Sequence, residues 1–123
     1  MSGVSVATDF GAVYAEAFSS GDINRVRQLY EPEAVLQGRD GKRHDGVNAI
    51  AAVLQPILCK GLRMETSARF LVEHGDLTLI RFDYSLFDKK GAKVYCASSS
   101  ELLRRSADGF WRLAIDLPSG SDA

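Results

Sequence analysis

The chain has 123 residues, the size of one domain, and we expect a single domain over residues 1–123. Its hydrophobic fraction of 46% and charged fraction of 25% are ordinary for a globular protein, and its net charge of −1 argues against nucleic-acid binding, which requires a concentrated basic face. No apolar run is long enough to cross a bilayer and the N-terminus lacks signal-peptide features. We therefore expect a cytoplasmic protein that binds no membrane.

The first part of the chain predicts two helices. Apolar residues recur at helical spacing over residues 6–20, and Gly21 is a typical residue to end such a helix. A second apolar stripe at helical spacing covers residues 22–30, and Pro32 is expected to end it.

A short strand, a turn and a third helix are expected next. Residues 34–36 form an apolar run typical of a strand, and residues 38–41 have the composition of a turn. The third helix opens after Gly46, and Pro56 is expected to kink it or end it early, because proline removes an amide donor.

The last part of the chain predicts four strands, at residues 63–74, 77–87, 92–105 and 110–117, separated only by turn signals. Helices followed by a strand meander predict an α+β domain in which three N-terminal helices pack on a curved, mostly antiparallel sheet. Such an arrangement leaves a cavity at its wider end, where small molecules bind. Residues from about 119 are expected to be disordered.

Alternation along each strand predicts which side chains face the helices. The strand over 77–87 presents one large apolar face, formed by Ile80, Phe82, Tyr84 and Leu86. In the last strand, alternation places Ile115 toward the helices and Asp116 on the opposite face. There Asp116 would pair with an arginine, such as Arg112 or Arg81.

Two small polar residues stand in the middle of the strand over 92–105. Alternation assigns Ser98 and Ser100 to the same face as Val94 and Leu102. Small residues at this position leave room beside the sheet, for a pocket wall, for a closely packed element or for solvent.

In this order, the elements resemble the nuclear transport factor 2-like superfamily, and more narrowly its SnoaL-like and ketosteroid-isomerase-homologue branch. The segments that carry the resemblance are Phe18–Ile23, Leu29–Val35, Asp45–Ile50, Leu103–Arg105 and Asp108–Leu113. The resemblance implies a cone-shaped, cystatin-like fold, a pocket between the first helix and the concave face of the sheet, and a homodimer formed through the sheet. It implies no single activity, because this fold carries both enzymes and proteins without catalysis.

Tyr14 is the first candidate catalytic residue. It precedes Gly21 by the spacing at which ketosteroid isomerases carry a tyrosine that donates a hydrogen bond to the developing oxyanion, so the resemblance implies this role. Tyr14 also stands within the apolar stripe of the first helix. It can therefore equally be a core tyrosine whose hydroxyl lies at the rim.

The other signature groups of those isomerases are changed. Gly38 stands where the resemblance places the catalytic base, and Asp40 could serve only if the loop bends inward; otherwise it caps a turn. His44 is a further candidate for acid–base work near the pocket mouth. The resemblance also implies an acid on the third long strand, where this chain has Ser98 and Ser100.

The first functional hypothesis is cofactor-free acid–base catalysis on a small, mostly apolar carbonyl compound, of isomerase, cyclase or dehydratase type. Tyr14 would polarise the carbonyl and Asp40 or His44 would move the proton, in a pocket lined by Phe18, Leu36, Met64, Phe82, Tyr84, Ser98, Ser100 and Ile115. The alternative is a non-catalytic module for small-molecule binding or dimerisation. The two histidines lack ligand spacing, and we expect no metal and no cofactor.

Overall fold

The computed structural model describes residues 3–119; beyond Ser119, the tail predicted to be disordered lies outside them. In chain order the elements are a 3₁₀ turn η1 (Ala7–Asp9), α1 (Phe10–Ser20), α2 (Ile23–Arg27), β1 (Tyr30–Gln37), β2 (Arg43–Asp45), α3 (Val47–Leu58), β3 (Arg63–His74), β4 (Leu77–Phe87), β5 (Lys93–Arg105) and β6 (Trp111–Leu117). No helix among the described residues is long and apolar enough to cross a membrane.

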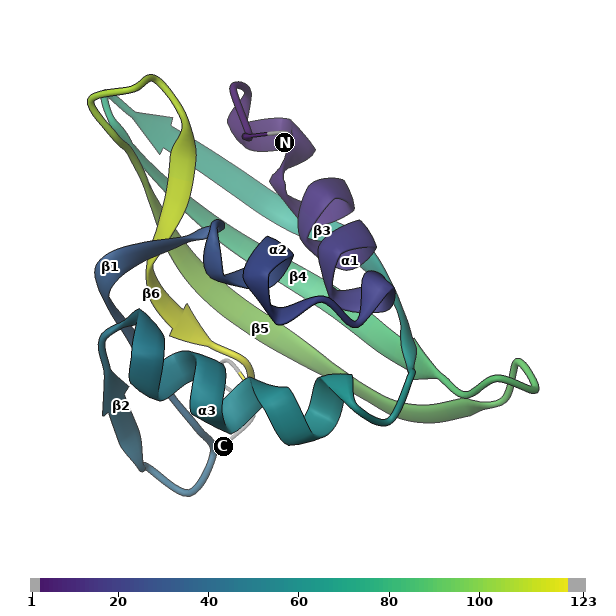
Figure 1. Cartoon of the computed structure of the whole chain (residues 1–123). Helices are drawn as coiled ribbons and strands as arrows, with labels where there is room; N and C mark the ends of the chain where they lie inside the picture. Colours follow the sequence, from purple (N-terminus) through teal and green to yellow (C-terminus); the bar gives the residue numbers. More distant parts are fainter. Residues whose placement is uncertain (1–2, 120–123) are drawn as a thin grey trace.

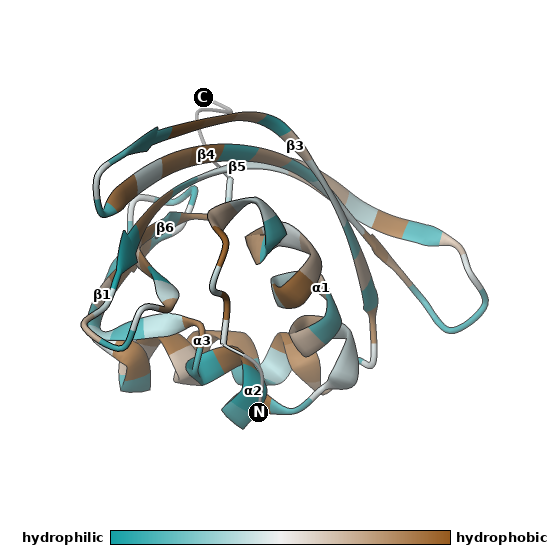
Figure 2. Cartoon of the chain, turned by 90° about the horizontal axis from the view of Figure 1, so that it is seen from above, coloured by the Kyte–Doolittle hydropathy of each residue, from teal (hydrophilic) through white to brown (hydrophobic). Residues whose placement is uncertain are grey.

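The six strands form one curved, open sheet in the order β2-β1-β6-β5-β4-β3 (Figure 1). Only β1 and β6 are parallel; the other neighbouring pairs are antiparallel. The sheet arches over the helices, which lie on its concave side (Figure 2). Helix α1 packs against β3 and α3 packs against β1. This arrangement confirms the predicted α+β fold class.

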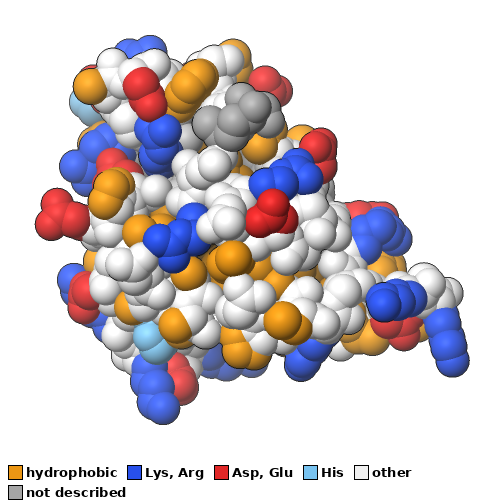
Figure 3. Space-filling model, in the orientation of Figure 1, with side chains coloured by type: hydrophobic (Ala, Val, Ile, Leu, Met, Phe, Trp, Pro, Cys, Tyr) orange, Lys and Arg blue, Asp and Glu red, His pale blue; other side chains and the backbone are white. Residues whose placement is uncertain are grey.

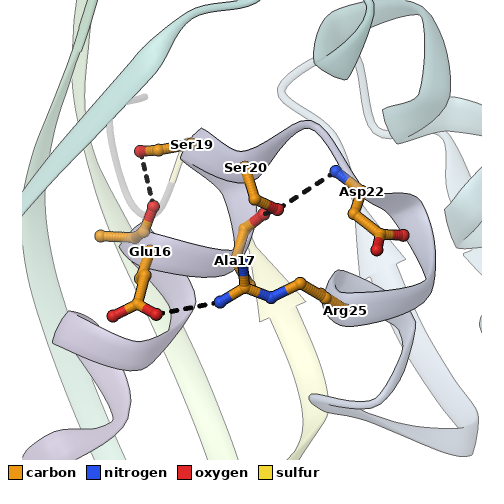
Figure 4. A network of polar contacts seen from close by, with 7 residues as sticks. Glu16, Ala17, Ser19, Ser20, Asp22 and Arg25 are labelled. Carbon is orange, nitrogen blue, oxygen red and sulfur yellow. Dashed lines mark hydrogen bonds and ion pairs between the residues drawn. The ribbon is translucent and has the colours of Figure 1, made fainter. Parts of the chain in front are cut away.

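The junction between α1 and α2 is fixed by local hydrogen bonds (Figure 4). Gly21 adopts a left-handed conformation with φ of 74°, which glycine reaches without steric cost. The Asp22 carboxylate then accepts a hydrogen bond from the Asn24 amide at 2.9 Å and caps α2. Arg25 donates to Glu16 at 3.0 Å across the two helices. The short α2 is therefore held beside α1.

The boundary between α2 and β1 differs from the prediction. Helix α2 ends at Arg27, and Tyr30 and Pro32 already belong to β1. Tyr30 pairs with Leu113 of β6, so tertiary pairing overrides the helical spacing that the side chains show in sequence. Strand β2, over 43–45, is also an addition to the predicted elements and lies where the sequence predicts a loop.

Helix α3 continues through Pro56 to Leu58, so the expectation that Pro56 ends it early is wrong. Proline lacks the amide that would bond to the Ala52 carbonyl, one turn earlier. Both Ala52 and Pro56 are exposed, so the lost bond lies on the solvent side of the helix, where it is more easily tolerated. Helix α3 carries no charged residue, and apolar side chains gather over it on the helical side of the molecule (Figure 3).

A β-bulge in β6 reverses the face assignment of the last strand. Leu102 and Leu103 of β5 oppose Ile115 and Leu113, respectively, so Ala114 is an extra residue without a partner. Beyond the bulge, Ile115 points outward and is 41% exposed, whereas Asp116 points inward and is 6% exposed. The predicted orientations of Ile115 and Asp116 are therefore wrong, because strict alternation does not hold across a bulge.

The inward face of β5 also differs from the prediction. Ser99 opposes Phe82 of β4, and Glu101 opposes Ile80, so these four side chains share the concave face. Ser98 and Ser100 consequently lie on the outer face, where Ser98 donates a hydrogen bond to Asp83 at 2.6 Å. The predicted face of the two serines is wrong by one residue, and a shift of one residue moves every side chain of a strand to the other face.

Helix α1 lies close to the sheet at Gly11. A Cβ atom at this residue would lie 2.6 Å from Phe82 Cε1 and 3.1 Å from Thr66 Oγ1. The absence of a side chain at Gly11 therefore lets the aromatic ring of Phe82 lie against the helix backbone.

Replacing Gly11 with alanine should destabilise the protein. Alanine gains about 1 kcal/mol of helix propensity over glycine, but overpacking against Phe82 costs about 1–3 kcal/mol. Urea unfolding should give a lower midpoint for G11A, and the double variant G11A/F82L should lose less than the sum of the single variants. A G11A protein more stable than wild type would contradict this packing account.

Candidate functional site

A cavity of about 670 Å³ lies between α1, the second half of α3 and the concave face of the sheet. This volume lies within the range of small-molecule sites. The lining residues are predominantly apolar or aromatic: Phe10, Gly11, Tyr14, Phe18, Leu36, Gly38, Val53, Leu54, Ile57, Lys60, Leu62, Met64, Thr66, Phe82, Tyr84, Leu86, Val94, Tyr95, Ser99, Glu101, Leu113, Asp116, Pro118 and Ser119.

The cavity opens to solvent near the start of β5. The lining residues Lys60, Val94 and Tyr95 are exposed and mark this mouth. Glu101 and Asp116 are buried, at 7% and 6% exposure, and place two carboxyl groups in the otherwise apolar interior.

A chain of hydrogen bonds links α1, β1 and β6 at the cavity wall. The hydroxyls of Tyr14 and Tyr30 lie 2.7 Å apart, and the Tyr30 hydroxyl donates to Asp116 Oδ2 at 2.6 Å. Tyr30 is 3% exposed and stands behind Tyr14, outside the lining itself. The chain therefore connects the Tyr14 hydroxyl to a buried carboxyl group.

The two carboxyl groups contact each other across neighbouring strands. Asp116 opposes Glu101 in the β5–β6 register, and their side chains are hydrogen-bonded. Ser99 Oγ donates to Glu101 Oε1 at 3.1 Å. Two carboxylates in contact cannot both be charged without strong repulsion, so the pair shares one proton.

The pKa values assign this proton. Burial, and then the charge of Asp116, raise the pKa of Glu101 well above its ordinary value. Burial also raises the pKa of Asp116, but hydrogen bonds from Glu101 and Tyr30 oppose that shift. We therefore take Glu101 as the protonated partner and Asp116 as the carboxylate. Burial, followed by the charge of Asp116, raises the pKa values of Tyr14 and Tyr30 well above the ordinary value, so both phenols are neutral.

The structure brings six of the predicted pocket residues to the cavity lining: Tyr14, Phe18, Leu36, Met64, Phe82 and Tyr84. Three others, Ser98, Ser100 and Ile115, lie on the outer face of the sheet, so their prediction as pocket residues is wrong. Asp40 is exposed and accepts a hydrogen bond from the Lys42 amide at 2.9 Å, which is a turn-capping contact. His44 is half-buried in β2, opposite Leu36, and is not among the described residues that line the cavity.

Sequence reasoning missed four members of the polar network: Tyr30, Ser99, Glu101 and Asp116. A signal for Ser99 and Glu101 is present, because the apolar face of β4 follows correctly from its alternation and the hairpin register then fixes its partners on β5. No group of three or more His, Cys, Asp and Glu side chains within residues 3–119 is arranged to hold a metal ion.

The sequence profile of the SnoaL-like domain matches residues 12–113. The chain belongs to the SnoaL-like domain family. A search of curated protein sequences gives no match. The family assignment confirms the resemblance noted from the sequence.

Three solved structures of similar fold are described under different names. A ketosteroid isomerase-like protein from Erwinia carotovora atroseptica SCRI1043 is 24% identical, with a TM-score of 0.72 and coverage of 93% of this chain and 92% of that one. A putative calcium/calmodulin-dependent protein kinase type II association domain from Thiobacillus denitrificans ATCC 25259 is 15% identical, with a TM-score of 0.80 and coverage of 95% and 96%. An NTF2-like protein from Novosphingobium aromaticivorans is 18% identical, with a TM-score of 0.77 and coverage of 94% and 79%. At these identities, the likeness establishes the fold alone.

The carboxyl pair should make stability depend on pH. Because the pKa values of Glu101 and Asp116 are raised in the folded protein, the folded state binds more protons than the unfolded chain above the ordinary carboxyl range. Stability should therefore fall as pH rises from that range through the raised values. In E101Q, whose amide donates to Asp116 without titrating, urea unfolding from pH 4 to 9 should show a weaker fall. The exposed Glu73→Gln is the matched control and should follow wild type; an E101Q profile parallel to wild type would contradict the assignment.

Proposed function

We propose that this protein binds a small, mostly apolar molecule in the cavity and moves a proton on it without a cofactor. The observation that carries the proposal is the pairing of Glu101 with Asp116, directly opposite each other on β5 and β6, inside an otherwise apolar cavity. One protonated and one charged carboxyl group, side by side, supply an acid and a base at neutral pH.

The reaction that suits this pair is proton transfer next to a carbonyl group. One carboxyl group of the pair gives a proton to the carbonyl oxygen, and the other, as a carboxylate, removes a proton from the adjacent carbon. An enol forms, and the pair still holds one proton. The same step, run in either direction, underlies isomerase-, cyclase- and dehydratase-type reactions. The proposal assigns to Glu101 and Asp116 the proton transfer that sequence reasoning gave to Asp40 or His44.

Deuterium exchange tests this reaction even when its final product is unidentified. Aryl ketones with a hydrogen on the adjacent carbon should exchange it faster in D₂O with wild-type protein, as followed by NMR. E101Q and D116N should each abolish the acceleration, because each removes one of the two proton-transferring groups. Y14F should reduce it by at least about tenfold, the usual scale for losing a hydroxyl in such a site.

Matched variants separate the carboxyl pair from Asp40 and His44 as the proton-transferring groups. D40N and H44Q should leave the exchange rate unchanged, since neither residue is among the lining residues of the cavity. Loss of exchange in either variant would move the acid–base role away from the carboxyl pair. Ketone binding in a thermal-shift assay without any exchange would favour the alternative, a binding protein without catalysis.

We also propose a homodimer formed through the outer face of the sheet. The support is a set of large apolar side chains exposed on that face: Phe70, Val72, Leu77, Leu79 and Ile115. Val72 opposes Leu79 across β3 and β4, so their side chains form a continuous apolar surface. Exposed apolar surface of this kind is typical of protein–protein interfaces.

Replacing Leu79 with lysine should convert the dimer to a monomer, because the charge would have to be buried without a partner. Light scattering coupled to size-exclusion chromatography measures the mass directly. Val6 is equally exposed, at 50% against 47% for Leu79, but lies in the N-terminal segment; V6K should therefore remain dimeric. A monomeric wild-type protein would contradict the proposal.

A further inference from the structure

The hydroxyl hydrogens of the cavity network can be assigned one by one. Tyr30 has a single hydroxyl hydrogen, and it is donated to Asp116 Oδ2 at 2.6 Å. In the 2.7 Å contact between the two tyrosines, Tyr14 must therefore be the donor and Tyr30 the acceptor. The Tyr14 hydrogen is used inside the network, so its oxygen can present only lone pairs to the cavity.

The hydrogen atoms of the other groups in the network can be assigned in the same way. Glu101 donates its proton to Asp116, and Ser99 donates its hydroxyl hydrogen to Glu101 Oε1 at 3.1 Å. Every hydrogen of these groups is thus directed at another member of the network. The oxygen atoms that this network presents to the cavity belong to Tyr14, Ser99, Glu101 and Asp116, and in this resting arrangement all of them are acceptors. Donor groups elsewhere in the lining belong to Lys60, Thr66, Tyr84, Tyr95 and Ser119.

We infer that this network, at rest, takes a ligand by a hydroxyl group that donates a hydrogen bond, rather than by a carbonyl group that accepts one. This inference rests on the proposed function and specifies its substrate: a compound held as an enol, or as the chemically similar phenol. The pair then converts enol to ketone. Asp116 accepts the hydroxyl proton while Glu101 gives its proton to carbon, so one O–H bond breaks, one C–H bond forms, and the pair keeps one proton.

Once Asp116 is protonated, the hydrogen bonds of the network can reverse. Protonated Asp116 donates to Tyr30, Tyr30 donates to Tyr14, and the Tyr14 hydrogen becomes available to the new carbonyl oxygen. Tyr30 is therefore a positioning residue, which acts by setting the hydrogen direction of Tyr14. In this scheme, Tyr14 accepts from the substrate and donates to the product.

Three naphthalene probes of similar shape test the inference at pH 7. They are 2-naphthol, which donates a hydrogen bond; 2-methoxynaphthalene, which has lost the donor; and 2-acetonaphthone, which presents a carbonyl. Isothermal titration calorimetry on the wild-type protein should show naphthol binding at least about tenfold tighter than the other two, the scale of a charge-assisted hydrogen bond.

The variant Tyr30→Phe gives the sharpest outcome, because it removes the acceptor of the Tyr14 hydrogen and frees that hydrogen for the cavity. Acetonaphthone should then bind tighter and naphthol weaker, so that their affinity ratio falls at least about tenfold relative to wild type. Thr78→Val removes a buried hydroxyl that is not among the lining residues of the cavity, and should keep the wild-type ratio. Where Y30F does not fold, Y14F serves instead and should erase the preference for naphthol.

The outcomes separate this inference from the proposed function. Wild-type protein that binds none of the three probes contradicts the proposed function, and the inference fails with it. Probes that bind with equal affinity, with a preference for acetonaphthone, or with a ratio that Y30F leaves unchanged overturn the hydrogen-bond direction and leave small-molecule binding intact.

Discussion

The extra residue in β6 is the constraint on which the rest of the site depends. Without Ala114, strict alternation would turn Asp116 outward and Ile115 into the cavity, which would then lose its carboxylate. With it, Asp116 faces both Glu101 on β5 and the Tyr30 hydroxyl on β1. A single unpaired backbone residue thus converts an apolar hollow into one that holds a pair of carboxyl groups.

Such a pair is costly to bury, and the surrounding contacts explain how the fold tolerates it. An isolated carboxylate in an apolar interior is strongly destabilising, whereas a carboxylate that accepts several hydrogen bonds is far less so. Asp116 accepts from Tyr30 and Glu101, and Ser99 supports Glu101 in turn. Replacing a buried charged pair by apolar residues of similar size is often neutral or stabilising. The presence of this network is therefore weak evidence for a contribution to stability.

The sequence predicts the fold of this protein more completely than it predicts the candidate site. The ends of β3 to β6 match the prediction to within a residue, because glycines at the intervening turns, such as Gly75 and Gly109, adopt positive φ and fix where each strand stops. Tyr30 shows the opposite case: its helical spacing is genuine, but pairing with β6 decides its conformation.

The site is harder to predict than the fold for a related reason. The aromatic wall, such as Phe18 and Phe82, follows from hydrophobic periodicity alone, whereas Glu101 and Asp116 are found only through cross-strand register, and one register step or one bulge moves a side chain to the other face.

Asp116 on β6 lies near Gly38, the position after β1 at which the resemblance would place a carboxylate. The resemblance to ketosteroid isomerases places a carboxylate just after β1, where this chain has Gly38. Asp116 pairs with Leu36 in the parallel β1–β6 register, so its backbone lies one strand spacing, about 4.8 Å, from the end of β1. Gly38 and Asp116 both line the cavity. A carboxylate supplied by β6 therefore lies near the region that a carboxylate after β1 would occupy, where Gly38 adds no side chain. The same fold can thus carry a carboxylate at this end of the cavity on a different strand.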